Sequence, residues 1–475
     1  MSKQNEAQGT PSVKRTAIAK VFDIIFCAHA DQTGGVEMAF QLCQKFLGRC
    51  QAVPHVRIAI ACPNNEKALA YAKGRIMSSP LFQHVGILPV EEGLAIVKSD
   101  SGSVDPYQTH AVLIERFGSE SLRQSHLNGY CDQLRPHVRP KKTLIVSCGE
   151  STALKFAHDM DMPRVIVTDM LLPDALREVL AYGGRLTSTA AQILSYFADF
   201  DRMALDAYLA APEFSGANYD TYFIGGGVRV LGLPSLFYDP IGAIALNPAR
   251  NNEPLQNLCD AVGDARRLAF VFGGGGPVWA DIYRQAADAY RLANPKPQFC
   301  LLVPAVEPDA MSSGKLRRVR GAAPWSDETL FKYWLFRPDS HTPIELLDPG
   351  SLASWYARAN LVVGRGGLVA QQVLALLLGD PPPAWPQLLF VEERGHPQIE
   401  HERQALTAMG FVQSCTLEHL IVNPLRVIED TMGNITPHDT EILRLRVRAR
   451  YSLHGLDRAI DAILHEHLNI GPSRA

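Results

Sequence analysis

Polar side chains and glycines follow two neighbouring apolar runs near the C-terminal end of the chain. The run Leu361–Val363 ends at a glycine-rich turn, and the run Leu388–Val391 ends at a polar loop. The turn and the loop contain Arg365, Gly366, Gly367, Glu393, Gly395, His396 and Gln398. The apolar stretch between the runs predicts a helix, which the prolines after it would end. Both polar groups therefore follow parallel strands, at the sheet edge where α/β proteins bind ligands, and they mix the donors and acceptors that hydroxyl-rich ligands need.

A second glycine-rich turn follows the predicted strand Leu268–Phe272. It consists of Gly273, Gly274, Gly275 and Gly276, and Pro277 stands at the favoured first position of the next helix. Glycine lets backbone N–H groups approach a phosphate, and the helix adds its positive end. A tight turn without a ligand explains the same residues. Four consecutive glycines do not match G-x-G-x-x-G, so a dinucleotide cofactor is not indicated.

The loop after the first predicted strand, Val21–Ala28, offers side chains that accept protons. It contains His29, Asp31, Thr33, Gly34 and Gly35. His29 and Asp31 are of the types that serve as general bases. Glu150 and Asp169 follow later strands of the same half, and either is an alternative base, although solvated acids are common in loops. The Glu150 region is not G-x-S-x-G, and no group of residues has metal-ligand spacing, so we expect neither a hydrolase nucleophile nor a metal.

Alternating strand and helix patterns fill both halves of the chain and predict parallel sheets covered by helices. Within the first half, we expect helices from Asp174 to about Leu209. Each half opens with a strand, a glycine turn and a helix. Between them lies a segment rich in Pro, Asn and Asp with weak periodicity. We expect a disordered lead-in at 1–20, a first Rossmann-like domain at 21–233, a connection at 234–265, a second Rossmann-like domain at 266–439 and a helical tail at 440–475.

Composition excludes several classes of protein. The chain has 475 residues, 47% of them hydrophobic and 20% charged, with a formal net charge of −3, so a nucleic-acid partner is not expected. We expect no transmembrane segment and no signal peptide, and we predict reduced cysteines and a cytoplasmic protein. The basic stretch Lys315–Arg320 favours a solvated loop, with an anionic partner or acceptor as the alternative. Peripheral membrane contact is compatible with this sequence.

The order Arg365-Gly366-Gly367, a helix with Gln371-Gln372, a strand, and Gly395-His396-Pro397-Gln398 resembles the donor half of GT-B glycosyltransferases, in particular the branch with the N-acetylglucosaminyltransferase that makes lipid II. The resemblance implies two Rossmann-like domains facing across a cleft. It implies that the turn at Arg365 faces a nucleotide diphosphate and that the loop from Glu393 to Gln398 touches the sugar. Gln371 or Gln372 stands where the family has a ribose-binding glutamate, and lacks its charge.

The resemblance also implies a Gly-Gly-His turn in the first domain, where this chain has Gly34-Gly35-Val36. Asp31 or His29 is then the candidate base, or neither is, and Thr33 to Gly35 form the acceptor-side loop. Glu37 is better explained as a partner of the helix dipole.

We predict a glycosyltransferase that moves a sugar from a nucleotide sugar, with UDP favoured, to an acceptor hydroxyl. The resemblance implies an inverting reaction without a metal. The alternatives are a nucleotide-sugar 2-epimerase of the same fold and a non-catalytic binding or scaffold protein. No motif identifies the acceptor, whose pocket would come from loops such as Ser101–Thr109 and Gly183–Thr187.

Overall fold

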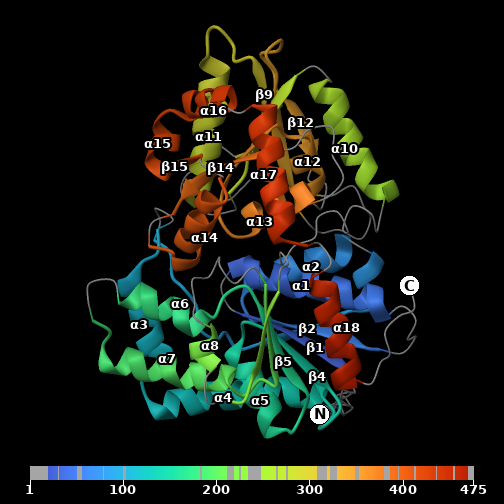
Figure 1. The fold of residues 1–475 in the computed structure, drawn as a ribbon, viewed down its shortest axis with the longest axis vertical. Helices are drawn as coiled ribbons and strands as arrows, with labels where there is room; N and C mark the ends of the chain where they lie inside the picture. Colours follow the sequence, from blue (N-terminus) through green and yellow to red (C-terminus); the bar gives the residue numbers. More distant parts are fainter. Residues whose placement is uncertain are drawn as a thin grey trace, which may run out of the picture.

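In the computed structural model, two α/β domains lie one above the other, as Figure 1 shows. The structure describes residues 20–29, 32–50, 56–78, 80–99, 103–181, 185–210, 219–223, 226–233, 248–263, 266–273, 277–306, 318–320, 329–347, 352–378, 386–393, 395–410, 413–434, 436–452 and 455–468.

The first domain is built on a seven-stranded, wholly parallel sheet with the order β3-β2-β1-β4-β5-β6-β7. Its strands are β1 (Ile24–Ala28), β2 (Ile58–Pro63), β3 (Gly86–Val90), β4 (Leu144–Cys148), β5 (Arg164–Thr168), β6 (Asp206–Ala210) and β7 (Arg229–Leu233). All residues of β1, β2 and β4 are buried, as expected for strands covered on both faces.

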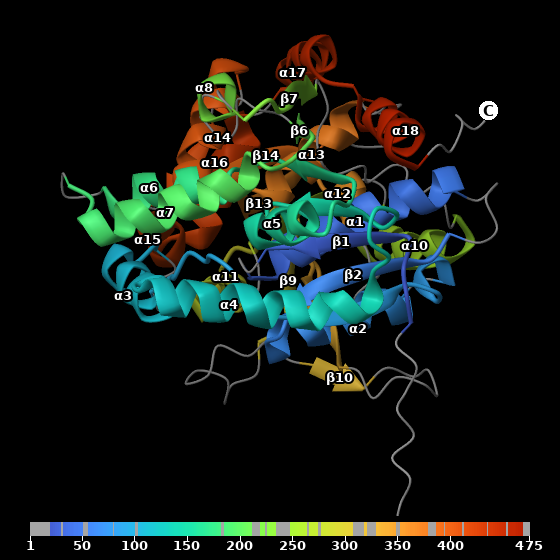
Figure 2. The same cartoon turned by 90° about the horizontal axis from the view of Figure 1, so that it is seen from below.

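Alternate residues of each central strand enter different cores. Ile24 and Phe26 of β1 pack with α1, α2 and the last helix of the chain, whereas Ile25 and Cys27 pack with α4 and α5. This follows from the two-residue period of a strand. A third cluster joins α3, α6 and α7 on the left-hand side of Figures 1 and 2. The helical elements are α1 (Gln32–Cys50), α2 (Glu66–Ser78), η1 (Pro80–Phe82), α3 (Pro106–Phe117), α4 (Glu120–Leu134), η2 (Arg135–His137), α5 (Ser151–Asp159), α6 (Leu172–Leu180), α7 (Ser188–Asp201) and α8 (Tyr219–Phe223).

The second domain has an eight-stranded sheet with the order β10-β11-β9-β8-β13-β14-β15 and β12 beside β11. The path from β9 to β15 is parallel, and the β10–β12 side is antiparallel. Its strands are β8 (Arg267–Val271), β9 (Phe299–Pro304), β10 (Arg318–Arg320), β11 (Thr329–Phe336), β12 (Ile344–Leu347), β13 (Leu361–Arg365), β14 (Gln387–Glu392) and β15 (Ser414–Thr416). Its helices are α10 (Pro248–Val262), α11 (Pro277–Leu292), α12 (Ala353–Arg358), α13 (Leu368–Leu378), α14 (Pro397–Ala408), α15 (Leu417–Val422) and α16 (Pro424–Asn434).

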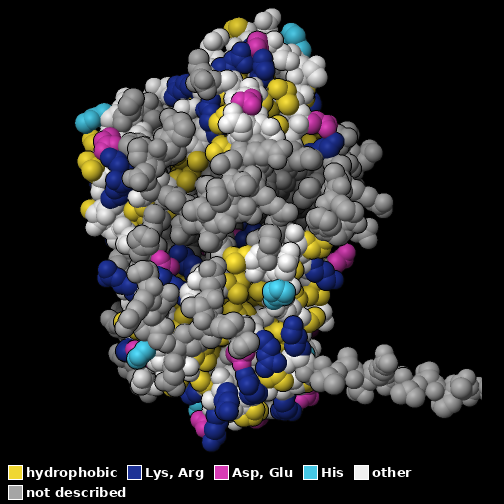
Figure 3. Space-filling model, turned by 90° about the vertical axis from the view of Figure 1, so that its right-hand side faces the viewer, with side chains coloured by type: hydrophobic (Ala, Val, Ile, Leu, Met, Phe, Trp, Pro, Cys, Tyr) yellow, Lys and Arg dark blue, Asp and Glu magenta, His cyan; other side chains and the backbone are white. Residues whose placement is uncertain are grey.

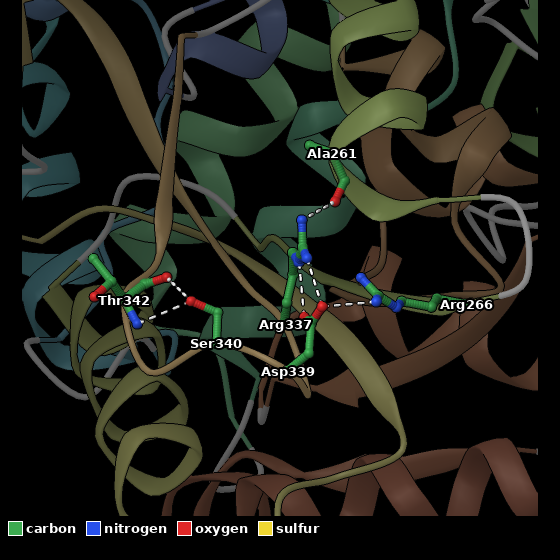
Figure 4. Close-up of polar contacts among 6 residues, drawn as sticks. All are labelled: Ala261, Arg266, Arg337, Asp339, Ser340 and Thr342. Carbon is green, nitrogen blue, oxygen red and sulfur yellow. Dashed lines mark hydrogen bonds and ion pairs between the residues drawn. The ribbon is translucent and has the colours of Figure 1, made fainter.

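The turn between β11 and β12 is fixed by polar contacts, which Figure 4 shows. Arg337 donates to both carboxylate oxygens of Asp339 at 2.9 and 2.6 Å, and Arg266 reaches the same carboxylate at 2.8 Å. The two guanidinium groups lower the pKa of Asp339, chiefly through the Arg337 hydrogen bonds. A further hydrogen bond from Arg337 to the Ala261 carbonyl ties the turn to the end of α10.

The chain ends in two helices that lie on different domains. In Figure 1, α17 (Pro437–Arg450) lies on the upper domain and α18 (Gly455–Leu468) on the lower one. Val447 of α17 packs in the core that contains α13, and Ile460 of α18 packs in the core that contains α1. The carboxylate of Asp457 in α18 accepts from Lys45 of α1 at 3.3 Å. The tail therefore returns to the first domain.

Two segments differ from the sequence-based expectation. Helices were expected as far as about Leu209, but α7 ends at Asp201 and Asp206–Ala210 form the buried strand β6. The run is too short and too apolar for its period to separate a strand from a helix. The expected connection at 234–265 contains α10, whose Leu258 packs in the core of the second domain.

The surface carries charges of both signs. On the face in Figure 3, Lys and Arg side chains and Asp and Glu side chains occur on both domains. Within the described ranges, no helix combines the length and the apolar character that crossing a membrane requires. Of the basic stretch, only 318–320 fall among the described residues, as β10.

Candidate functional site

Side chains from both domains meet at one buried carboxylate. Asp169 follows β5 of the first domain and is 4% exposed. Its Oδ2 accepts the side-chain amide of Gln371 on α13 at 2.8 Å and that of Gln398 on α14 at 3.3 Å. Burial raises the pKa of Asp169, and the Gln371 hydrogen bond and nearby His29 oppose that rise. The carboxyl end of β5 thus faces the N-terminal ends of α13 and α14, the helices that follow the glycine turn and the polar loop of the second domain.

A buried ion-pair triad lies at the same interface. Glu393, directly after β14, accepts from Arg365 at 3.1 Å and from Lys98 of the first domain at 2.8 Å. The Glu393 side chain is 4% exposed. Burial alone would raise its pKa, but Arg365 and Lys98 outweigh that effect and hold the pKa at about 2. Glu393 is therefore ionised at neutral pH, and this charge lies between two cations.

The turn between β13 and α13 holds a second buried acid. Glu402 on α14 is fully buried, and its Oε2 accepts the backbone N–H of Gly367. Gly367 has a φ of +76°, which side-chain-bearing residues rarely adopt. A Cβ at Gly366 would collide with this carboxyl and with the ring of Phe390. The bare backbone of the turn therefore accommodates a carboxyl group.

His29 lies in the first domain beside Asp169. Its side chain is 5% exposed, and the ring lies between Gly35 on α1 and Gly149 after β4. A Cβ at Gly35 would come within 2.9 Å of the imidazole Nε2. The two glycines thus make room for an imidazole ring at the carboxyl edge of the sheet. Asp31 lies outside the described residues, as does the side chain of Thr33.

Glu150 is placed differently from Asp169. Its Oε1 accepts the backbone N–H of Thr152 at 3.1 Å and caps α5. Burial raises the pKa of Glu150 to about 7. A second buried acid, Asp201, interacts with it, and burial raises the pKa of Asp201 to about 7 as well. Glu150 therefore has a structural contact that Asp169 lacks.

The glycine turn after β8 is described only at Gly273, and Gly274, Gly275 and Gly276 lie outside the described residues. The N–H of Gly273 donates to the hydroxyl of Tyr283 at 3.0 Å, and the ring of Trp279 covers its Cα. The structure therefore gives this first glycine a partner within α11.

The other predicted residues lie in the loop before α14, in α1 and in α13. His396 is 4% exposed and precedes α14, and Gly395 is exposed with a φ of +78°. Gly34 and Gly35 lie in the first turns of α1, exposed and buried respectively. Of the glutamine pair, Gln371 is fully buried in contact with Asp169, whereas Gln372 is only partly buried.

Sequence reasoning did not single out two residues of this cluster. Lys98 lies in the loop between β3 and α3 with no signal of its own, and only the fold brings it to Glu393. Glu402 stands four residues after Gln398 on one face of a helix, a spacing visible in the sequence. The direction of that face toward Gly367 was not predictable.

Among the residues that the structure describes, one group could offer three metal ligands: Asp206, Glu466 and His467, whose ligand atoms lie within 4.8 Å of one another. The guanidinium of Arg229 already bonds to Asp206 at 2.7 Å and also to Glu466. This cation offsets part of the negative charge of the two carboxylates, and the group joins α18 to the first sheet. Cys27, Cys62, Cys131, Cys148, Cys300 and Cys415 are free thiols.

Two solved structures share this architecture. One is the glycosyltransferase of kitacinnamycin, with a TM-score of 0.51 and 13% identity over 94% of this chain and 100% of the other. The second, a UDP-glucosyltransferase from Polygonum tinctorium that glucosylates indoxyl, has a TM-score of 0.54 and 12% identity over 94% of this chain and 98% of its own. No protein-family model and no curated protein sequence matches the chain. The chain therefore has the GT-B fold of two Rossmann-like domains.

Proposed function

We propose that this protein is a glycosyltransferase that transfers a sugar from a nucleotide sugar to an acceptor hydroxyl. The observation that carries the proposal is the contact of Asp169 with Gln371 and Gln398. Gln371 and Gln398, which the sequence predicts as donor contacts of the second domain, meet Asp169 of the first domain at one buried place, and His29 lies beside Asp169. The GT-B fold supports the same reaction class. UDP remains the favoured nucleotide, since one neighbour of this fold is a UDP-glucosyltransferase.

His29 is the base that we favour, with Asp31 as the alternative in the same loop. The base takes the proton of the acceptor hydroxyl while that oxygen attacks the anomeric carbon. An imidazole that gains a proton becomes a cation, and the Asp169 carboxylate nearby favours that form. Asp169 would then position and stabilise the protonated ring while it holds the donor-side amides.

The leaving group is a nucleoside diphosphate, which needs positive charge and N–H donors as it departs. Arg365 supplies a guanidinium at the end of β13, and the glycine turn after β8 precedes the N-terminus of α11. The proposal assigns the diphosphate to these two turns, and the four glycines from Gly273 to Gly276 remain candidates for contact.

We assign the sugar and ribose hydroxyls to polar residues of α13, of α14 and of the loop between β14 and α14. Gln398, Glu393 and His396 border the interface, where they offer both donors and acceptors. Gln371 is favoured over Gln372 because its amide reaches the interface. Without the charge of a glutamate, such a contact binds hydroxyls more weakly. The acceptor stays unassigned.

The test is to incubate the purified protein with UDP-, GDP- and dTDP-linked sugars and to measure release of free nucleoside diphosphate. Slow hydrolysis of one donor supports a transferase. Asp169→Asn should abolish that hydrolysis, whereas Gln372→Ala, at the partly buried position next to Gln371 on α13, should not. A sugar altered at C2 would instead identify an epimerase, and no binding of any donor would identify a scaffold. Product stereochemistry by NMR and activity in a chelator test the inverting, metal-independent course.

A further inference from the structure

Two acceptors compete for the hydrogen bond from the Gly367 N–H. Under the proposed function this turn faces the donor's diphosphate, yet the same N–H already donates to the Glu402 carboxyl. A carboxylate and a phosphate oxygen seek the same kind of donor. One N–H makes one strong hydrogen bond, so a phosphate oxygen must displace Glu402 Oε2 from the Gly367 N–H, and the charge on Glu402 sets how strongly Oε2 competes.

The second oxygen of Glu402 shows what that state is. Glu402 Oε1 is buried and has no hydrogen-bond partner among the described residues. An ionised carboxylate with a bare buried oxygen is strongly disfavoured, whereas a neutral carboxyl can carry its proton there. Burial raises the pKa of Glu402 to about 8, the Gly367 N–H and Arg365 oppose the rise, and Asp169 adds to it.

The charged groups around α14 leave this balance intact. Asp169 and Arg365 are the groups that act on the Glu402 carboxyl itself. On the side of α6, His401 contacts Glu178 at 3.2 Å, and Asp174 also interacts with His401. On the solvent side, Arg403 of α14 bonds to Glu400 and interacts with Glu392 of β14. These other charges pair away from Glu402.

We propose, resting on the proposed function, that the donor's diphosphate binds at the Gly366–Gly367 turn with Glu402 protonated, so that Glu402 sets the pH above which the donor no longer binds. An ionised Glu402 holds the Gly367 N–H through a charge-assisted hydrogen bond and repels the phosphate, whereas a neutral Glu402 holds that N–H more weakly. A neutral Glu402 places no negative charge beside the phosphate. Glu402 thus couples donor affinity to the binding of one proton.

The test is calorimetric binding of UDP between about pH 7 and pH 9.5 to the wild type, Glu402→Gln and Glu400→Gln. Glu400 is an exposed acid on the same helix and serves as the control. The wild type and Glu400→Gln should lose affinity above pH 8, by up to roughly tenfold for each further pH unit, as one-proton linkage requires. In Glu402→Gln this loss of UDP affinity above pH 8 should be absent. The titration of UDP itself affects all three proteins equally, so it cancels when their affinities are compared. The same slope in Glu402→Gln would overturn the proposal.

A second measurement needs no variant. At about pH 9, the wild type should take up close to one proton per UDP bound, read from binding enthalpies in two buffers of different ionisation enthalpy. Uptake near zero would overturn the proposal even if Glu402→Gln does not fold. If UDP binds at every pH without proton uptake, this inference fails and the proposed function stands. If UDP does not bind at any pH, both fail.

Discussion

The side-chain amide of Gln371 donates to the Asp169 carboxylate across the domain interface at 2.8 Å, and both residues are buried. Asp169 follows β5 of the first sheet, and Gln371 lies on α13, the helix after a glycine turn of the second domain. Through this contact, polar residues of both domains form a single site.

Replacing Asp169 with Asn should lower kcat while leaving the fold intact. Asn keeps the size of the side chain but removes the charge that favours a protonated His29. We expect a fall in kcat of about 10²-fold or more, with a smaller change in KM. Steady-state rates of nucleoside diphosphate release measure this. Asp174→Asn, a carboxyl of α6 that interacts with Arg177 and His401, is the control, and an equal effect there would refute a special role for Asp169.

Replacing Lys98 with Met should destabilise the interface, since it removes one cation from buried Glu393. The loss should be roughly 2 kcal/mol of unfolding free energy, because a buried charge loses a partner while Arg365 remains. Urea unfolding at neutral pH measures it. Lys155→Met removes an exposed pair within one helix turn and should cost less than about 0.5 kcal/mol. Equal losses would show that the Glu393 triad does not join the domains.

The Glu393 triad also predicts a pH dependence. The folded pKa of Glu393 is depressed to about 2, so its contribution to stability is present above its ordinary pKa and is lost as pH falls toward 2. Glu393→Gln should therefore be less stable than the wild type near neutral pH, and the difference should shrink in acid. Unfolding curves at several pH values give this difference, and a constant gap would contradict the assigned pKa.

The raised pKa of Glu402 predicts that stability changes with pH in the opposite direction to the Glu393 contribution. Its folded pKa is raised to about 8, so the folded state holds a proton that the unfolded state releases, and stability falls as pH rises between the two pKa values. Glu402→Gln should be more stable than the wild type at about pH 8 by roughly 2–5 kcal/mol, with the gain disappearing at acid pH. Urea unfolding of both proteins decides this, and a gain that is independent of pH would exclude a titrating Glu402.

The last helix should stabilise the first domain. Ile460 on α18 is fully buried in the core with α1, so Ile460→Ala should cost about 2–5 kcal/mol. Leu445 on α17 is 58% exposed, and Leu445→Ala should change stability by less than about 0.5 kcal/mol. Thermal or urea unfolding compares them. A negligible effect of Ile460→Ala would mean that the tail is not part of the first domain's core.

The fold was predictable because its signals are local. Buried strands such as Leu361–Val363 and the glycine turns after them read directly from the sequence, and the GT-B fold expected from them is confirmed. The strand Asp206–Ala210 was missed because a short apolar run is equally compatible with a helix. Parallel pairing with β5, far away in sequence, decides between the two.

For each contact between the domains, the sequence predicted the residue of the second domain but not which residue of the first domain it meets. Gln371, Gln398 and Glu393 were chosen from their places after strands, and their roles stay predictions. Their partners could not be chosen with the same certainty, because Lys98 and Asp169 meet them only through docking of the domains. A sequence pattern gives the face of a helix but not what lies opposite it.

The most direct measurement of the central claim is calorimetry of the wild-type protein with uridine, guanosine and thymidine diphosphates at about pH 7, where Glu402 is protonated. The account predicts saturable binding of at least one of them, with UDP favoured, and weaker binding when Arg365 is replaced by Ala. Absence of any heat of association with all three, in a protein shown to be folded, would contradict it.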